Sequence, residues 1–189
     1  MIPSSGHGAH PVLLGKFGRN SALTAFLVIS AASCMGAQPE LPKSQLGTVT
    51  QMVGGSRIEI VYRRPVARGR QLFGSLVRWG RTWTPSADTA AIFSTTTPLD
   101  VAGGRLPAGK YSIWMVPDST MWTVIFSSAQ PVFHLYYRPT HDVLKVRVAP
   151  RTSDHMETLG FYFPMVDADS AVLNMHWGRT VVPIPIRAR

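Results

Sequence analysis

The sequence predicts an all-β fold, namely an antiparallel β-sandwich or jelly-roll-like domain of about eight to ten short strands. Charged residues make up only 15% of the 189-residue chain, below the roughly 25% of an average domain. Turn-forming residues are frequent, with 16 glycines and 15 prolines. Between the turns, apolar and polar residues alternate with the period of two that half-buried strands show. An open barrel of the same strands is the alternative architecture.

Residues 1–37 have the order of a signal peptide. A polar stretch ends in Lys16 and Arg19, an apolar run occupies 22–32, and small residues fill 33–37. The apolar run is much shorter than the roughly 20 residues that a spanning helix needs. We therefore expect export to the periplasm or the exterior, with no transmembrane span after processing.

The chain has one cysteine, Cys34, and it lies inside this export segment. The sequence Ala31-Ala32-Ser33-Cys34 has the small residues of a lipoprotein cleavage site, although Ala31 stands where leucine is usual. Lipidation of Cys34 and a lipid-anchored protein are thus the alternative to free secretion. In either case the domain forms no internal disulfide and depends on burial of its core.

We expect a linker at 38–47 and one β domain at 48–189. The segments predicted to be strands are 57–62, 110–116, 122–127, 143–148, 158–163, 171–177 and 181–186. Their alternation assigns these side chains to the core: Ile58, Ile60, Tyr111, Ile113, Val124, Phe126, Val146, Phe161 and Leu173. The dipeptides at 54–55 and 103–104 are two glycines each, which predicts tight turns there.

Two segments, 181–186 and 70–77, carry more specific structural predictions. Pro183 and Pro185 share a face of the segment 181–186, and proline cannot donate to a β ladder, so this strand is predicted at a sheet edge. The segment 70–77 is the one predicted helical turn, because Leu72, Phe73, Leu76 and Val77 would share a face of a helix.

Several short motifs resemble, in order and spacing, the DUF2911 family of bacterial exported proteins. They are Tyr62-Arg63-Arg64-Pro65, Gly69-Arg70, Phe73-Gly74, Leu76-Val77, Trp83, the run 106–112, Pro117 and the run 122–126. The resemblance covers about 48–186. It implies a β-rich extracytoplasmic domain, and it implies no reaction because the family's function is unknown.

The segment 84–91 departs from the family pattern. Family members usually read close to Arg-Thr-Gly-Ala-Asn-Glu-Ala-Thr after the tryptophan, whereas this chain reads Thr-Pro-Ser-Ala-Asp-Thr-Ala-Ala. Asp88 can replace asparagine as a turn former, but Thr89 stands where the family has an acid. If this loop is the family's site, the change alters or removes its function.

The candidate site lies in the arginine-rich stretch 63–81, which has six arginines and no acid. Guanidinium groups bind carboxylate, phosphate or sulfate in pairs of hydrogen bonds, and indoles offer stacking faces to sugar rings. We expect Arg64 and Arg70 to anchor an anion or backbone carbonyls. Trp83 would form the stacking wall, and Asp88 would be a counter-charge or a ligand acceptor. The alternative is structural: the two arginines hydrogen-bond carbonyls or pair with Asp88, and the tryptophans fill the core.

Other function classes lack their signatures. The formal net charge of +9 is dispersed along the chain with no nucleic-acid-binding motif, so we expect no nucleic acid. The histidines lack metal-ligand spacing, which predicts no metal or cofactor; His134 and His176 on one face are the metal alternative. Asp167 and Asp169 are expected to form an Asx turn rather than a calcium loop.

We therefore expect a non-catalytic envelope protein that binds a ligand or partner, with an anionic molecule or a glycan as the ligand. The alternative is a carbohydrate-active hydrolase or isomerase on a jelly-roll scaffold, whose carboxylates would come from Glu59, Glu157, Asp88 and Asp142. No nucleophile elbow is present, and the sequence leaves the oligomeric state open.

Overall fold

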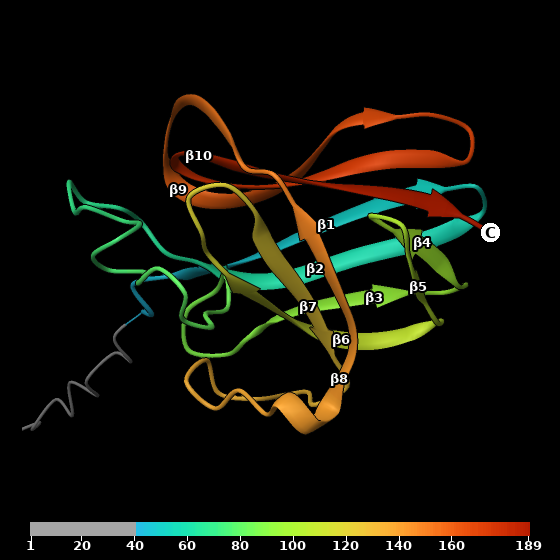
Figure 1. Ribbon diagram of the computed structural model, residues 1–189, viewed down its shortest axis with the longest axis horizontal. Coiled ribbons are helices and arrows are strands. Elements are labelled where there is room, and N and C mark those ends of the chain that lie inside the picture. Colours follow the sequence, from blue (N-terminus) through green and yellow to red (C-terminus); the bar gives the residue numbers. More distant parts are fainter. Residues whose placement is uncertain (1–40) are drawn as a thin grey trace, which may run out of the picture. The chain divides into compact units, whose positions relative to one another are not determined.

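The computed structural model describes residues 41–189, which form two antiparallel sheets packed face to face (Figure 1). The strands are β1 (Gln45–Val53), β2 (Ser56–Arg64), β3 (Ala91–Thr95), β4 (Leu99–Val101), β5 (Gly104–Leu106), β6 (Gly109–Val116), β7 (Trp122–Ser127), β8 (Asp142–Val148), β9 (Arg151–Val166) and β10 (Ser170–Ala188). The larger sheet has the order β1-β2-β3-β6-β7-β8, and the smaller sheet has the order β5-β4-β10-β9. The predicted all-β sandwich is confirmed.

The core lies between the two sheets and is built from the alternating positions. All nine side chains predicted for it are buried: Ile58, Ile60, Tyr111, Ile113, Val124, Phe126, Val146, Phe161 and Leu173. The hairpin between β1 and β2 turns at Gly54 and Gly55, whose φ angles of 52° and 81° lie in the left-handed region that favours glycine. The export segment predicted at 1–37, including the possible lipidation of Cys34, lies outside the described residues. Within 41–189, no helix is long and apolar enough to cross a membrane.

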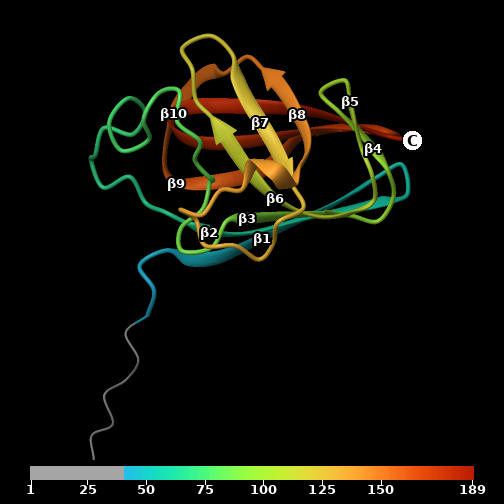
Figure 2. The same ribbon diagram turned by 60° about the horizontal axis from the view of Figure 1, so that its bottom comes forward.

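A second, smaller cluster covers the outer face of the larger sheet. Trp114 and Ile125 point to this face, opposite the core, and pack with Val132 and Tyr137. These last two come from the segment between β7 and β8, which lies over the sheet (Figure 2). The Tyr137 hydroxyl donates to Asp142 Oδ2 at 2.5 Å. Burial and then this carboxylate raise the pKa of Tyr137.

The predicted helical turn at 70–77 is wrong. This segment is a compact turn in which the Val77 amide donates to Leu72 O and the Gly74 amide donates to Val77 O, both at 2.8 Å. Gly74 has a φ of 88°, which interrupts helical geometry. Leu72 and Val77 are still buried, because both face the end of the sandwich from a turn.

The predicted edge position of the last strand is also wrong. The segments 171–177 and 181–186 are one strand, β10, and it lies inside the smaller sheet between β4 and β9. Its pairing with β9 ends at Val181, and its pairing with β4 begins at Ile186. Pro183 and Pro185 lie between these two paired stretches, where no ladder hydrogen bond requires the amide hydrogen that proline lacks. Strand β1 begins at Gln45, inside the predicted linker.

Candidate functional site

The long loop between β2 and β3 crosses one end of the sandwich (Figure 1). Its first residues are held by β9. Arg64 Nε donates to Leu159 O at 3.2 Å, and the Leu159 amide donates to Pro65 O at 2.9 Å. The Ala67 amide donates to Glu157 O at 2.8 Å. The start of the loop is therefore held by backbone hydrogen bonds to β9, a strand far away in sequence.

Glu157 ties this part of the loop with its side chain as well. Its carboxylate accepts from the Arg68 amide at 2.5 Å and contacts His155 Nε2 at 2.8 Å. The hydrogen bond with His155, followed by that from the Arg68 backbone, lowers the pKa of Glu157. Its carbonyl also accepts from Trp177 Nε1 at 3.2 Å, so one residue fixes both the loop and an indole.

Aromatic side chains fasten the middle of the loop to the sandwich. Phe73 lies 5.0 Å from Trp122 and 6.2 Å from Trp83, measured between ring centroids, in edge-to-face geometry. Trp83 stacks on Trp177 with centroids 6.0 Å apart and an interplanar angle of 10°. Such pairs stabilise beyond the area they bury. The tryptophans therefore pack against the core, as the structural alternative predicted.

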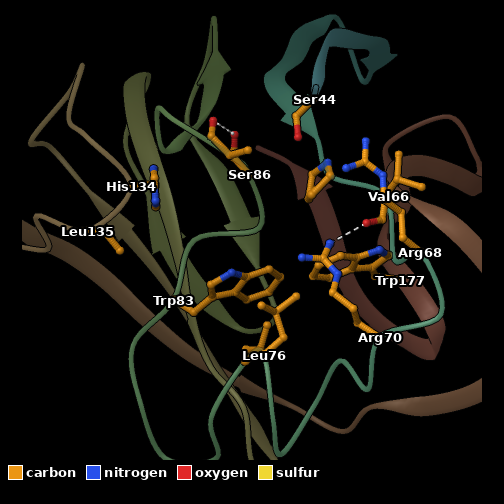
Figure 3. A pocket seen from close by; sticks show the side chains of 13 residues that line it. Ser44, Val66, Arg68, Arg70, Leu76, Trp83, Ser86, His134, Leu135 and Trp177 are labelled. Atoms are coloured by element: carbon orange, nitrogen blue, oxygen red, sulfur yellow. Dashed lines mark hydrogen bonds between the residues drawn. The ribbon is translucent and has the colours of Figure 1, made fainter. Parts of the chain in front are cut away.

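A pocket of about 420 Å³ lies beside this cluster, between the β2–β3 loop and the segment after β7 (Figure 3). The two stacked indoles, Trp83 and Trp177, line it together with the side chains of Arg68 and Arg70. From the other loop come His134 and Leu135. Aromatic surface and guanidinium groups thus meet in one cavity.

Of the four candidate residues, the structure brings Arg70 and Trp83 into this pocket. Arg70 is already engaged with backbone, because its Nε donates to Ala67 O at 2.8 Å and its Nη2 donates to Val66 O at 2.7 Å. The sequence missed Arg68, whose side chain is exposed and forms no hydrogen bond or ion pair within 41–189. Its φ of 53° is uncommon for a residue with a side chain, and no sequence signal predicts it.

Arg64 and Asp88 do not line the pocket. Arg64 binds the Leu159 carbonyl, so it is an anchor of backbone. Both Arg64 and Arg70 thus hydrogen-bond carbonyls, as the structural alternative predicted. The predicted pairing of either with Asp88 is wrong, because Asp88 pairs with Arg63 at 3.5 Å. The φ of 61° at Asp88 fits the predicted turn-forming role.

The segment 84–91, which departs from the family pattern, lies at the end of the β2–β3 loop and contacts the second loop of the pocket. Thr84 Oγ1 donates to Ile113 O at 2.7 Å, which fixes the segment to β6. The Asp88 carbonyl accepts from the His134 amide at 3.1 Å. Thr89 is exposed and forms a backbone bridge to Phe133. The departure therefore lies at the pocket's wall.

The remaining candidates lie elsewhere. His176 contacts the Tyr162 hydroxyl at 3.3 Å, and residues 41–189 contain no group of three or more His, Cys, Asp or Glu placed to hold a metal ion. Asp167 Oδ1 accepts from the amide of the next residue, Ala168, at 2.7 Å, and not from that of Asp169 as an Asx turn requires. Glu59 is paired with Arg57 at 2.7 Å.

Comparison with known proteins identifies the family of the chain and gives no activity or ligand. No curated protein and no solved structure matches the chain. The model of the family described as "Protein of unknown function (DUF2911)" matches residues 44–186, which is most of the chain and includes every residue of the pocket. The motifs around the arginine-rich loop thus come from a shared domain, and the chain belongs to the DUF2911 family.

Proposed function

We propose that this protein is a non-catalytic, exported binding domain whose pocket takes an acidic sugar, one carrying carboxylate or sulfate. The observation that supports this most is the convergence of Arg68 and Arg70 with the stacked indoles of Trp83 and Trp177 in one cavity. Within 41–189, the residues that line this cavity include no aspartate or glutamate. Glu157 binds the Arg68 amide and feels the Arg68 charge, but it does not line the cavity, so the two lining arginines outweigh it and the local charge favours an anion.

The chemistry assigns different parts of the ligand to different side chains. The Arg68 guanidinium is free to form paired hydrogen bonds with a carboxylate or sulfate, whereas Arg70 uses two of its nitrogens on the loop carbonyls and adds charge. Of the two indoles only Trp83 is partly exposed, and its free surface is where the carbon face of a sugar ring would pack, whereas Trp177 is 2% exposed and supports Trp83 from the core. The volume of about 420 Å³ is in the range of pockets for small ligands.

The test is calorimetric titration of the full chain with three short glycans: an oligogalacturonate, a heparin-derived sulfated oligosaccharide and neutral maltohexaose. We expect binding of at least one acidic glycan and none of maltohexaose. Arg68→Ala should weaken it at least roughly tenfold, the effect of losing a charge-assisted hydrogen bond. Because Arg68 has no side-chain partner among the described residues, this variant should keep its unfolding temperature.

Arg81→Ala is the matched control, since Arg81 is exposed on the same loop and does not line the pocket. Trp83→Ala against Trp79→Ala makes the same comparison for an indole, with the unfolding temperature of each variant measured alongside because Trp83 also packs on Phe73 and Trp177. Equal losses in each pair, or no binding of either acidic glycan, would refute the proposal. The same mixtures are assayed for new reducing ends, whose release would favour the hydrolase alternative.

A further inference from the structure

Large apolar side chains that remain exposed gather on the two loops beside the pocket. Of the eleven such side chains in residues 41–189, five lie there: Leu76, Trp79, Phe133, Leu135 and Tyr136. We call these five the rim. Leu135 and Tyr136 are 71% and 64% exposed. Leu76 and Leu135 line the same pocket from different loops, and the ring centroids of Phe133 and Tyr136 lie 5.4 Å apart. Exposed apolar side chains of both loops therefore meet at the pocket, and such a concentration marks an interaction site.

The second loop does not need its rim side chains for its own packing. Val132 and Tyr137 anchor it, since both pack against Trp114 on the outer face of the larger sheet. The Tyr137 hydroxyl adds its hydrogen bond to Asp142. Between these two anchors Phe133 packs only against its loop neighbours His134 and Tyr136, and Leu135 and Tyr136 remain mostly in solvent, so the core does not explain their apolar character.

Cations accompany the rim on both loops. Arg78 and Arg81 are exposed on the β2–β3 loop, and Arg138 is exposed two residues after Tyr136, the last rim residue of the second loop. None of the three is in an ion pair within the described part of the chain. Leucine and aromatic side chains flanked by arginine are the composition of segments that lie at the surface of an anionic membrane.

We propose that the rim docks the domain on an anionic lipid surface, with its apolar side chains at headgroup depth and the three arginines against lipid phosphates. Charge argues against a second copy of this chain as the occupant, because that copy, with a formal net charge of +9, would place the same arginines opposite each other. The proposal does not depend on what fills the pocket.

The test is flotation of the full chain with vesicles of equimolar phosphatidylcholine and phosphatidylglycerol, compared with vesicles of phosphatidylcholine alone. We expect flotation with the anionic vesicles, falling as salt is raised. Leu135→Ser and Tyr136→Ser should each lower the partition coefficient roughly tenfold, since each removes a buried apolar side chain from the bound state. Arg78→Gln should lower it roughly fivefold. Tyr136 does not line the pocket, so its effect is separate from ligand binding.

Met52→Ser and Arg105→Gln are the matched controls. Both residues are exposed, and they come from β1 and β5, near the end of the sandwich opposite the β2–β3 loop (Figure 1). Every variant keeps the same export segment, so differences between variants report the substituted side chain. Unchanged flotation of the Leu135 and Tyr136 variants, or equal losses in the controls, would overturn the proposal. A rim variant that loses self-association in sedimentation velocity but still binds vesicles would also overturn the proposal, because the rim would then contact a second copy of the chain.

Discussion

Phe161→Ala gives the sharpest measure of how the two sheets are held together. The Phe161 side chain is 3% exposed, and its ring meets the Tyr62 ring edge-to-face with centroids 4.9 Å apart. Phe161 comes from β9 of the smaller sheet and Tyr62 from β2 of the larger sheet, so the substitution opens a cavity between the sheets.

The expected cost is about 3–5 kcal/mol of unfolding free energy, the range for truncating a buried phenylalanine. Of this, about 0.5–1.5 kcal/mol is the aromatic pair with Tyr62. A loss of this size is a large part of the roughly 5–15 kcal/mol that stabilises a typical domain. For a domain of this length it lowers the melting temperature by about 6–20 °C.

Urea unfolding of the full chain, followed by tryptophan fluorescence, measures this cost. Phe161→Leu keeps most of the buried volume and should cost less than about 1.5 kcal/mol. Phe133→Ala removes a ring that is 44% exposed and should cost less than about 1 kcal/mol. If Phe161→Ala costs no more than Phe133→Ala, Phe161 is not in the inter-sheet core and the packing described above is incorrect.

Three further substitutions test individual contacts. Tyr62→Phe leaves the buried Phe161 amide, which donates to the Tyr62 hydroxyl at 2.9 Å, without an acceptor, and should cost about 1–3 kcal/mol in urea unfolding. Gly74→Ala should lower the melting temperature more than Gly69→Ala: both have positive φ, but only at Gly74 would the new Cβ lie 2.7 Å from an atom of Trp79. Because the pKa of Glu157 is lowered from 4.5, its contribution to stability is present above that value and disappears as pH falls through the lower folded-state pKa. The acid limb of a thermal unfolding profile should therefore flatten in Glu157→Gln, and an unchanged limb would exclude this role.

The core was predictable because alternation is a local property of a strand. At β6, for example, Ile113 and Met115 face the core while Trp114 faces outward, as the period of two requires. Sheet order is not local. The prolines of β10 read as an edge signal, yet they lie where the strand changes partners from β9 to β4, and no pattern within the strand records which neighbours it has.

In the candidate site, too, the sequence predicted the local composition but not the contacts between distant segments. Arginine and tryptophan content pointed to a loop that does line a pocket, and Arg70 and Trp83 are among the lining residues. Composition cannot tell which guanidinium a nearby carbonyl will occupy. Arg64 is bound to Leu159 O, which depends on β9 lying beside the loop. Arg68 itself has a left-handed φ, and its guanidinium forms no hydrogen bond within 41–189.

The pocket therefore depends on contacts between segments that are distant in sequence. Glu157 O accepts from both the Ala67 amide and Trp177 Nε1, so one carbonyl of β9 positions both the loop and the indole that line the pocket. On the opposite wall, the Asp88 carbonyl holds the His134 amide. A substitution in β9 that shifts this carbonyl would move two walls of the pocket together without removing any residue that lines it. Loss of ligand binding in a β9 variant would then report altered positioning, and titration of Arg68→Ala remains the direct measure of ligand contact.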